Sequence, residues 1–237
     1  MYRQSGIHGR GDGNETVIQS SPINHEGVRI AKFTQKGWLV TGCSDGFIQV
    51  YSSESSDTMK RIKSFSAHDS AICSLDVHPT KPYVLSSSNK EWKLWDHKKG
   101  WHCIRVFETE DMIIKVKFNP TDADSFVSFN SCELQIWNFN LPEFAHKFSA
   151  LRRMECFDFF TRGSHLYLIT VSSDTKKAMI WDYESETCLQ ILQYGVTSVC
   201  SHPDLPIIFT GSTNGTVHLW NSNNFRPDGK YNFGLGE

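Results

Sequence analysis

The sequence predicts an all-β propeller with about five blades of four strands each. An aromatic residue recurs at the end of a short apolar segment, at Tyr51, Trp95, Trp137, Trp181 and Trp220. Successive positions are 44, 42, 44 and 39 residues apart. A Trp-Asp or Trp-Asn pair that returns about every 40 to 45 residues is typical of four-stranded blades repeated around an axis.

Each repeat unit carries the same succession of strand and turn signals. An alternating segment such as Val28–Phe33 predicts a half-buried first strand. The dipeptides His78-Pro79, Asn119-Pro120 and His202-Pro203 predict the next turn, because proline cannot donate to a sheet ladder. An apolar strand, a tight turn and the Trp-bearing strand follow. The units predicted in this way are 28–66, 67–106, 107–147, 148–189 and 190–229.

Two tight turns are predicted from residue type. Asp45-Gly46 and Asn214-Gly215 each stand between strand-like segments, and both residues of such a pair tolerate positive φ. We therefore expect two-residue hairpins at these places, with Asp45 as a structural residue of its blade.

The two ends of the chain differ from the repeats. Residues 1–25 are rich in Gly, Ser and Asn without apolar periodicity, which predicts a disordered tail. The propeller is expected over 26–233 and a short tail over 234–237, with 231–233 as a possible start of a sixth blade. Propellers of this kind usually close with seven blades, so five units either form an unusual ring or stay open. An open arc would leave unpaired edges through which copies of the chain could associate.

Composition excludes several classes of function. The 237 residues include 24 Lys and Arg against 26 Asp and Glu, so the net charge of −2 provides no overall attraction to nucleic acid. Apolar runs have strand length, and the beginning of the chain lacks the pattern of a secretion signal, so we expect a cytoplasmic protein that does not insert into membranes. The seven cysteines contain no C-x-x-C pair. No motif predicts a cofactor, a metal site or catalytic residues.

The repeats resemble WD40 blades, in which His, Ser or Thr, Asp and Trp form one hydrogen-bonded chain. His68, Trp95, Trp137, Trp181 and Trp220 occupy the structural positions of this pattern. Asn89 stands where the turn Asp of the second unit would be, and no unit keeps all four residue types. We therefore expect the polar network to be mostly lost and stability to depend on apolar packing.

Whole segments are also similar to the N-terminal propeller of the coatomer beta-prime subunit family. The resemblance runs from about 28 to 233 and is most specific in its last third. The segments that carry it are Val28–Phe33, Trp38–Gly42, Ala67-His68 through Val77–Thr80, Lys93–Asp96 with Trp101, His202–Ser212 and Gly215–Trp220.

The resemblance implies a non-catalytic interaction module of the COPI vesicle coat, acting in retrograde Golgi-to-ER transport. Its partners would be other coatomer subunits, which would bring it to Golgi membranes, and cargo tails that end in a dilysine signal. By this analogy Arg29 would hold the peptide carboxylate and Asp174 a lysine ammonium. Ser70 and Asn89 stand where the family has lysine-binding aspartates, so weakened cargo binding is expected.

Two other functions remain open. The chain could be a WD40 scaffold or substrate receptor of another complex, such as a ubiquitin ligase. Receptors of that kind often carry Trp-Asp-x-Arg, whereas the corresponding fourth residues here are Lys98 and Glu184. The chain could also be a structural protein that associates with itself through open blade edges.

Overall fold

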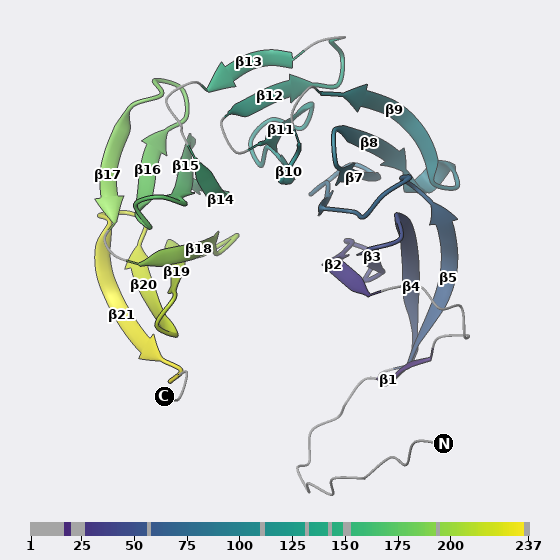
Figure 1. Ribbon diagram of the computed structural model, residues 1–237, viewed down its shortest axis with the longest axis horizontal. Helices are drawn as coiled ribbons and strands as arrows, with labels where there is room; N and C mark the ends of the chain where they lie inside the picture. Colours follow the sequence, from purple (N-terminus) through teal and green to yellow (C-terminus); the bar gives the residue numbers. More distant parts are fainter. Residues whose placement is uncertain are drawn as a thin grey trace, which may run out of the picture.

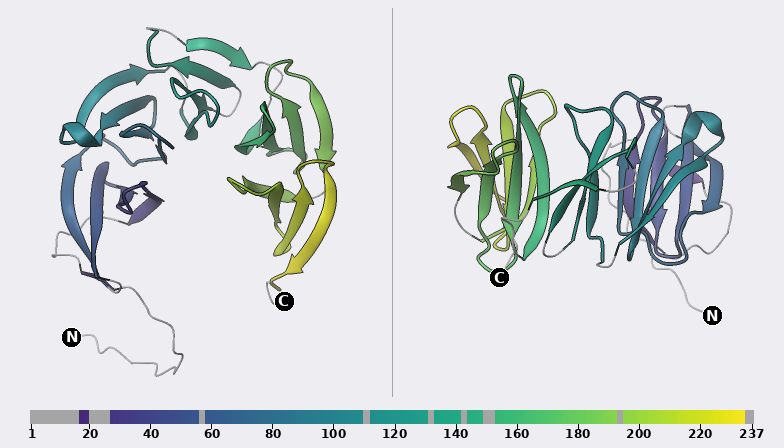
Figure 2. Two further views of the ribbon diagram at one scale, coloured as in Figure 1. Left: turned by 180° about the vertical axis from the view of Figure 1, so that it is seen from behind. Right: turned by 90° about the horizontal axis from the view of Figure 1, so that it is seen from above.

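Five antiparallel blades of four strands stand side by side around a central opening in a computed structural model, and a short fifth strand joins the sheet of the first blade (Figure 1). The structure describes residues 17–19, 27–55, 58–109, 112–130, 133–141, 144–148, 153–192 and 195–234. The sheets form an open arc, and the first and last blades do not meet (Figures 1 and 2). The prediction of an all-β propeller with about five blades is confirmed, and the arc stays open.

Within each blade the strands follow one another from the central opening to the outer rim. Blade 1 contains β2 (Val28–Phe33), β3 (Leu39–Cys43), β4 (Phe47–Ser55) and β5 (Thr58–Ser66). Blade 2 contains β6 (Ser74–Val77), β7 (Tyr83–Ser88), β8 (Glu91–Asp96), the 3₁₀ helix η1 (His97–Lys99) and β9 (His102–Glu108). Blade 3 contains β10 (Lys115–Phe118), β11 (Ser125–Phe129), β12 (Leu134–Asn138) and β13 (Phe144–Phe148).

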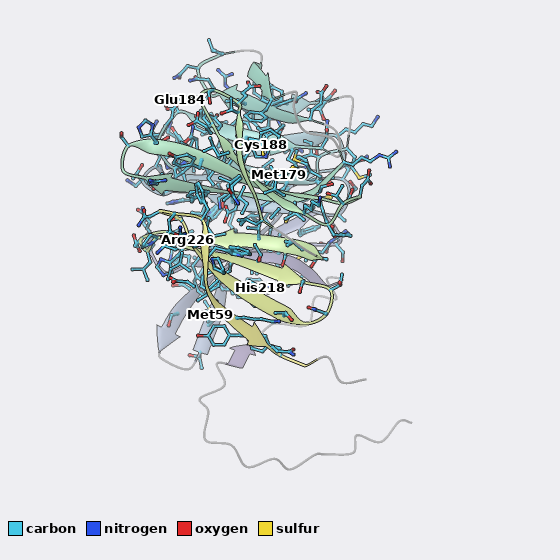
Figure 3. The ribbon with its side chains drawn as sticks, turned by 90° about the vertical axis from the view of Figure 1, so that its left-hand side faces the viewer. Met59, Met179, Glu184, Cys188, His218 and Arg226 are labelled. Atoms are coloured by element: carbon cyan, nitrogen blue, oxygen red, sulfur yellow. The ribbon has the colours of Figure 1, made fainter. Side chains whose placement is uncertain are left out.

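The last two blades repeat this order. Blade 4 contains β14 (Met154–Arg162), β15 (His165–Ser172), β16 (Ala178–Asp182) and β17 (Cys188–Leu192). Blade 5 contains β18 (Val196–Ser201), β19 (Ile207–Ser212), β20 (Thr216–Asn221) and β21 (Arg226–Asn232). Figure 3 looks onto the outer strands β17 and β21, where Cys188 and Arg226 are exposed.

Antiparallel pairing gives the arc two distinct faces. We call the face at which the inner strands β2, β6, β10, β14 and β18 begin the upper face, and the face at which they end the lower face. The β3–β4 and β15–β16 turns lie on the upper face, and the β2–β3 and β6–β7 turns and η1 lie on the lower face. Figure 2 shows the arc from the side.

The two glycine turns form hairpins, but they are wider than predicted. Gly46 has φ +84° and Gly215 has φ +74°, whereas Asp45 and Asn214 have no positive φ. The amides of Gly46 and Gly215 donate to residues three positions earlier, Cys43 and Ser212. The expectation of positive φ at both residues of each pair is therefore wrong, because these turns need left-handed backbone only at the glycine.

The two ends of the arc depart from the sequence-based expectations. Val17–Gln19 forms β1, which pairs in parallel with Thr58–Lys60 on the outer edge of blade 1. The prediction of a disordered tail does not hold for these three residues, and the other residues of 1–25 lie outside the described part. At the opposite end Tyr231 and Asn232 complete β21 by pairing with Val217 and Thr216, so they belong to blade 5 and start no sixth blade.

Largely buried carboxylates connect the inner strands of successive blades. The Asp76 side chain on β6 accepts a hydrogen bond from the Phe118 amide of β10, at 2.9 Å. The Asp158 side chain on β14 accepts one from the Ser201 amide of β18, at 2.8 Å, and forms an ion pair with Lys117 of β10. These contacts set one blade against the next around the central opening.

Candidate functional site on the upper face

Bulges interrupt three inner strands near the upper face. The register of β2 against β3 shifts between Val28 and Ile30, so Arg29 is the extra residue. Equivalent shifts leave Glu155 extra in β14 and Thr197 extra in β18. A bulge changes the direction of a side chain and often adjoins a functional site. Arg29, the residue expected to hold a carboxylate, is exposed at this edge.

Asp174, the residue expected to hold a lysine, already faces a cation of its own chain. It lies in the β15–β16 turn, and its two carboxylate oxygens are 3.4 and 3.2 Å from Nη1 of Arg153. The amide and hydroxyl of Ser173 both donate to the Arg153 carbonyl, at 2.7 and 2.8 Å, which fixes Arg153 beside the turn. The Asp174 side chain is 50% exposed, so a solvent-borne ligand can still reach it.

A second ion pair stands beside the first. Lys176, at the end of the same turn, donates to Oε2 of Glu155 at 2.6 Å. Both carboxylates on the upper face of blade 4 therefore have an internal cation. Sequence analysis missed Glu155, Arg153 and Lys176, because only the fold brings the start of β14 next to the β15–β16 turn.

Arg29 and Asp174 share the upper face but not a blade. Arg29 lies on blade 1 and Asp174 on blade 4, on opposite sides of the central opening (Figure 1). Between them, on blade 2, Ser70 and Ser88 lie with their hydroxyl oxygens 2.7 Å apart. Asn89 adopts φ +47° in the adjacent turn. A ligand that touched both Arg29 and Asp174 would have to span the opening.

The polar network of blade 2 is complete, contrary to the prediction. His68 lies with Nε2 2.7 Å from Oγ of Ser86 and Nδ1 2.6 Å from Oε1 of Glu91. The indole of Trp95 donates to the same Ser86 oxygen, at 2.8 Å. Glu91, at the start of β8, takes the place of the missing turn aspartate. The expectation that the network is mostly lost is therefore wrong for this blade.

Other blades keep the half of the network that links the tryptophan to a hydroxyl. In each case the indole nitrogen of β12, β16 or β20 donates to a serine or threonine on the preceding strand. The pairs are Trp137 with Ser128 (2.7 Å), Trp181 with Thr170 (3.0 Å) and Trp220 with Thr210 (2.9 Å). In blade 1, Tyr51 bonds to Gln49 instead, and Asp45 accepts a bond from the Phe47 amide at 3.1 Å.

Burial and local charge set the protonation states of the blade 2 network. Burial lowers the pKa of His68 and outweighs the attraction of Glu91, so the ring is neutral at pH 7. A neutral His68 donates from Nδ1 to Glu91 and accepts at Nε2 from Ser86. Burial alone would raise the pKa of Glu91. Its hydrogen bonds to His68 and Lys93 have the larger combined effect, so the pKa is lowered.

The described part contains no candidate metal cluster and no candidate membrane-spanning helix. No three His, Cys, Asp or Glu residues there are grouped so that they could hold a metal ion. Within the same residues, no helix has the length and apolar character needed to cross a bilayer.

Three pockets open on the lower face, away from Arg29 and Asp174. One lies between blades 1 and 2 and is lined by the β2–β3 and β6–β7 turns and η1. A second lies between blades 3 and 4 and includes Asp122 and Glu184. A third lies at the central opening, and Pro79, Pro120 and Pro203 are among the residues that line it.

Comparison with known proteins supports the repeat assignment and the resemblance. Residues 59–96 and 186–221 match the family model "WD domain, G-beta repeat". The chain is 34% identical to coatomer subunit beta' of Rattus norvegicus over 228 residues, which cover 93% of this chain and 25% of that protein. It is 40% identical to coatomer subunit beta'-2 of Arabidopsis thaliana over 118 residues, which cover 47% of this chain and 13% of that protein.

A fungal relative gives the same result. The chain is 31% identical to the probable coatomer subunit beta' of Schizosaccharomyces pombe over 148 residues, which cover 57% of this chain and 18% of that protein. The chain thus spans no more than about a quarter of the length of these relatives. It is an open propeller of WD40 repeats whose sequence is similar to coatomer subunit beta'.

Proposed function

We propose that this chain is a non-catalytic protein-interaction module of the COPI type, and that its upper face binds C-terminal dilysine tails weakly. The observation that carries the proposal is the position of Arg29. A bulge places its guanidinium in solvent at the upper edge of the innermost strand of blade 1. A guanidinium is well suited to hold a terminal carboxylate through paired hydrogen bonds.

The ion pairs of blade 4 account for the weak binding that we propose. A lysine of the ligand would have to displace Arg153 from Asp174, or Lys176 from Glu155. An exposed ion pair contributes only about 0 to 1 kcal/mol, so this competition would lower affinity by up to about fivefold. Such a site would still bind, but less tightly than one with free carboxylates.

A peptide titration tests the proposal. Fluorescence anisotropy would be measured with a peptide that carries two lysines just before its C-terminus, and with the same peptide carrying serines instead. We expect saturable binding of the lysine peptide only. Arg29→Ala should weaken it by about tenfold, because the carboxylate loses its partner.

Two further variants separate the site from its surroundings. Arg153→Ala should strengthen binding of the lysine peptide, since Asp174 is then released, whereas Arg226→Ala on the outer rim of blade 5 should have no effect. Equal binding of the lysine and serine peptides would reject the dilysine ligand. The interaction-module proposal would then rest on other partners.

The remaining partners and the location follow from the same proposal. The chain would act in the cytoplasm and would meet Golgi membranes only through other coatomer subunits. Co-purification of those subunits with the tagged chain is the expected result, and its absence at all salt concentrations would contradict the coat association. Self-association through the open ends of the arc would appear as a mass that rises with protein concentration.

A further inference from the structure

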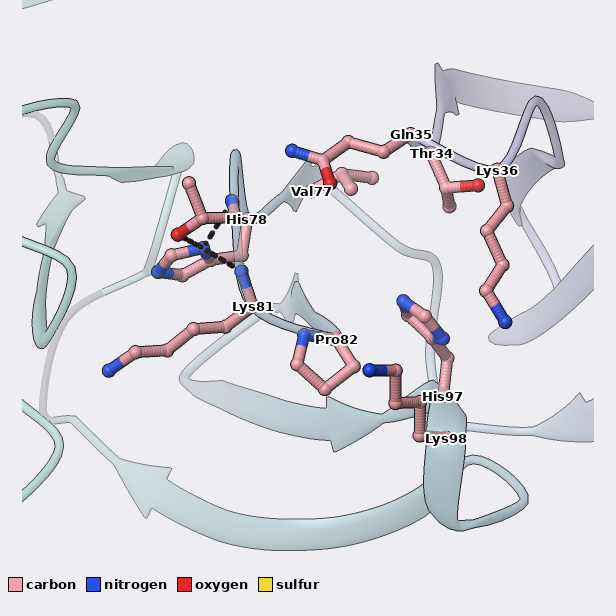
Figure 4. Close-up of a pocket in the computed structure, with 10 residues that line it drawn as sticks. Thr34, Gln35, Lys36, Val77, His78, Lys81, Pro82, His97 and Lys98 are labelled. Carbon is pink, nitrogen blue, oxygen red and sulfur yellow. Dashed lines mark hydrogen bonds between the residues drawn. The ribbon is translucent and has the colours of Figure 1, made fainter.

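A basic pocket on the lower face lies where blades 1 and 2 meet (Figure 4). It has a volume of about 160 Å³ and is bounded by the β2–β3 turn, the β6–β7 turn and η1. Because a site of about 10 to 15 Å³ suffices for one water, this space can hold a group as large as a phosphate with some solvent. The pocket is thus of a size for a small polar group.

The lining of the pocket is positively charged. Its ten residues include three lysines and two histidines but no carboxylate. Lys81 bonds to Asp124 at 2.5 Å, and its side chain points away from the other cations (Figure 4). Lys36 and Lys98 lie with their ammonium ends on either side of the His97 ring. Two cations from separate elements therefore face one histidine.

His97 has an unused polar atom inside this cluster. Its Nδ1 is buried and has no hydrogen-bond partner among the residues that the structure describes. The ring packs edge-on against Trp38 at 5.7 Å between centroids, and Nζ of Lys36 lies 4.8 Å from the centre of the same indole. A buried nitrogen without a partner costs free energy. Because this atom is closed off from solvent, a ligand in the pocket would act on the His97 ring through its charge.

The charges around His97 also favour an anion. Burial lowers the pKa of His97, the cations Lys36 and Lys98 lower it further, and Asp96 acts in the opposite direction. The Asp96 side chain already accepts hydrogen bonds from the backbone amides of Lys98 and Lys99 in its own turn, at 2.9 and 3.2 Å. An anion in the pocket would be attracted by both lysines and would favour the protonated form of His97.

The basic character does not follow from the fold, because an equivalent pocket has the opposite charge. The pocket between blades 3 and 4 is formed by the corresponding turns, yet it contains Asp122 and Glu184 and no lysine or arginine. There burial and nearby acidic groups, Asp122 among them, raise the pKa of Tyr183. The same backbone arrangement therefore carries a cationic lining in one place and an anionic lining in another.

We propose that the pocket between blades 1 and 2 binds a phosphate monoester, with Lys36 and Lys98 as its charged partners and the His97 ring beside them. A phosphate carries close to two negative charges at pH 7 and offers several strong acceptors, to which two ammonium groups can donate. The site lies on the lower face and is independent of peptide binding on the upper face.

The test follows the His97 ring by NMR in the full chain, with the signal assigned from a His97→Gln variant. Inorganic phosphate and glycerol 3-phosphate would each be titrated against chloride at constant ionic strength. We expect a saturable shift of the His97 signal and a rise in its pKa when either phosphate is bound. The double variant Lys36→Gln, Lys98→Gln should raise the Kd by about tenfold or more.

A matched variant and a lipid arm complete the design. Lys90→Gln removes one lysine charge from the upper end of blade 2 and should leave the Kd unchanged. Vesicles of phosphatidylcholine with and without phosphatidylinositol 4-phosphate distinguish the source. Preferential binding to the vesicles that contain phosphatidylinositol 4-phosphate would identify the ligand as a lipid headgroup. Preferential binding of glycerol 3-phosphate would identify it as a free phosphate ester. A lack of saturable response to all these probes, or an unchanged Kd in the folded double variant, would overturn the proposal.

Discussion

The His68 imidazole and the Glu91 carboxylate lie 2.6 Å apart, from Nδ1 to Oε1, and this contact completes the hydrogen-bonded chain of blade 2. His68 precedes β6 and Glu91 begins β8, so the contact ties the connection from blade 1 to the middle of blade 2. Lys93 adds to it, because its ammonium reaches Glu91 at 3.1 Å and the Ala67 carbonyl at 2.8 Å.

Removal of Glu91 should destabilise the protein, because the buried Nδ1–H of His68 would lose its acceptor. We expect Glu91→Ala to lower the free energy of unfolding by about 2 kcal/mol in urea denaturation. Glu108→Ala is the matched control, since Glu108 is exposed and pairs with Glu91 across the sheet. An equal effect of the two substitutions would contradict a structural role of the His68–Glu91 contact.

Stability should fall as the pH falls from about 7 to 5. Burial lowers the pKa of His68, His78 and His97 in the folded state, whereas an unfolded histidine titrates near pH 6.5. Between these values the unfolded chain binds more protons, so the free energy of unfolding rises with pH. Urea denaturation at pH 7.5, 6.0 and 5.0 measures the slope, and His68→Asn should reduce it. A constant free energy across this range would refute the prediction.

Lys117 should be needed to keep Asp158 charged in the interior. The Asp158 side chain is only 7% exposed, and burial alone would raise its pKa, but the attraction of Lys117 keeps that pKa below its usual value. Lys117→Met leaves a buried carboxylate without its main cation and should cost about 3 kcal/mol. Lys230→Met on the exposed face of β21 should cost almost nothing. Thermal unfolding of both variants would show whether the two costs differ in this way.

Two glycines with similar backbone angles should respond differently to alanine. Gly46 has φ +84°, and a Cβ there would lie 2.1 Å from the His68 carbonyl oxygen. Gly100 has φ +70° with no atom within 4 Å of its Cβ position. Gly100→Ala should therefore cost only the backbone strain of about 1 kcal/mol, and Gly46→Ala clearly more. Similar losses of stability in the two variants would show that the close approach at Gly46 is relieved at little cost.

Local sequence signals were sufficient for the blades and for the residues that repeat within them. The strand alternation, the X-Pro turns and the recurring Trp depend on neighbours in the chain, and they predicted the four-stranded units. The glycine turns were placed correctly, but the φ angle of Asp45 was not, since the turn type depends on how the flanking strands pair.

The sequence by itself determined an all-β propeller of about five WD40 blades, because period and alternation are properties of the chain. Only the tertiary structure decided that the arc stays open, that Glu91 replaces the missing turn aspartate, and that Arg153 forms an ion pair with Asp174. The last two depend on antiparallel register and on the connections between strands, which bring residues about 20 positions apart within hydrogen-bond distance. No local pattern reports such distances, so charge pairing on the upper face and the basic pocket on the lower face emerge only from the folded chain.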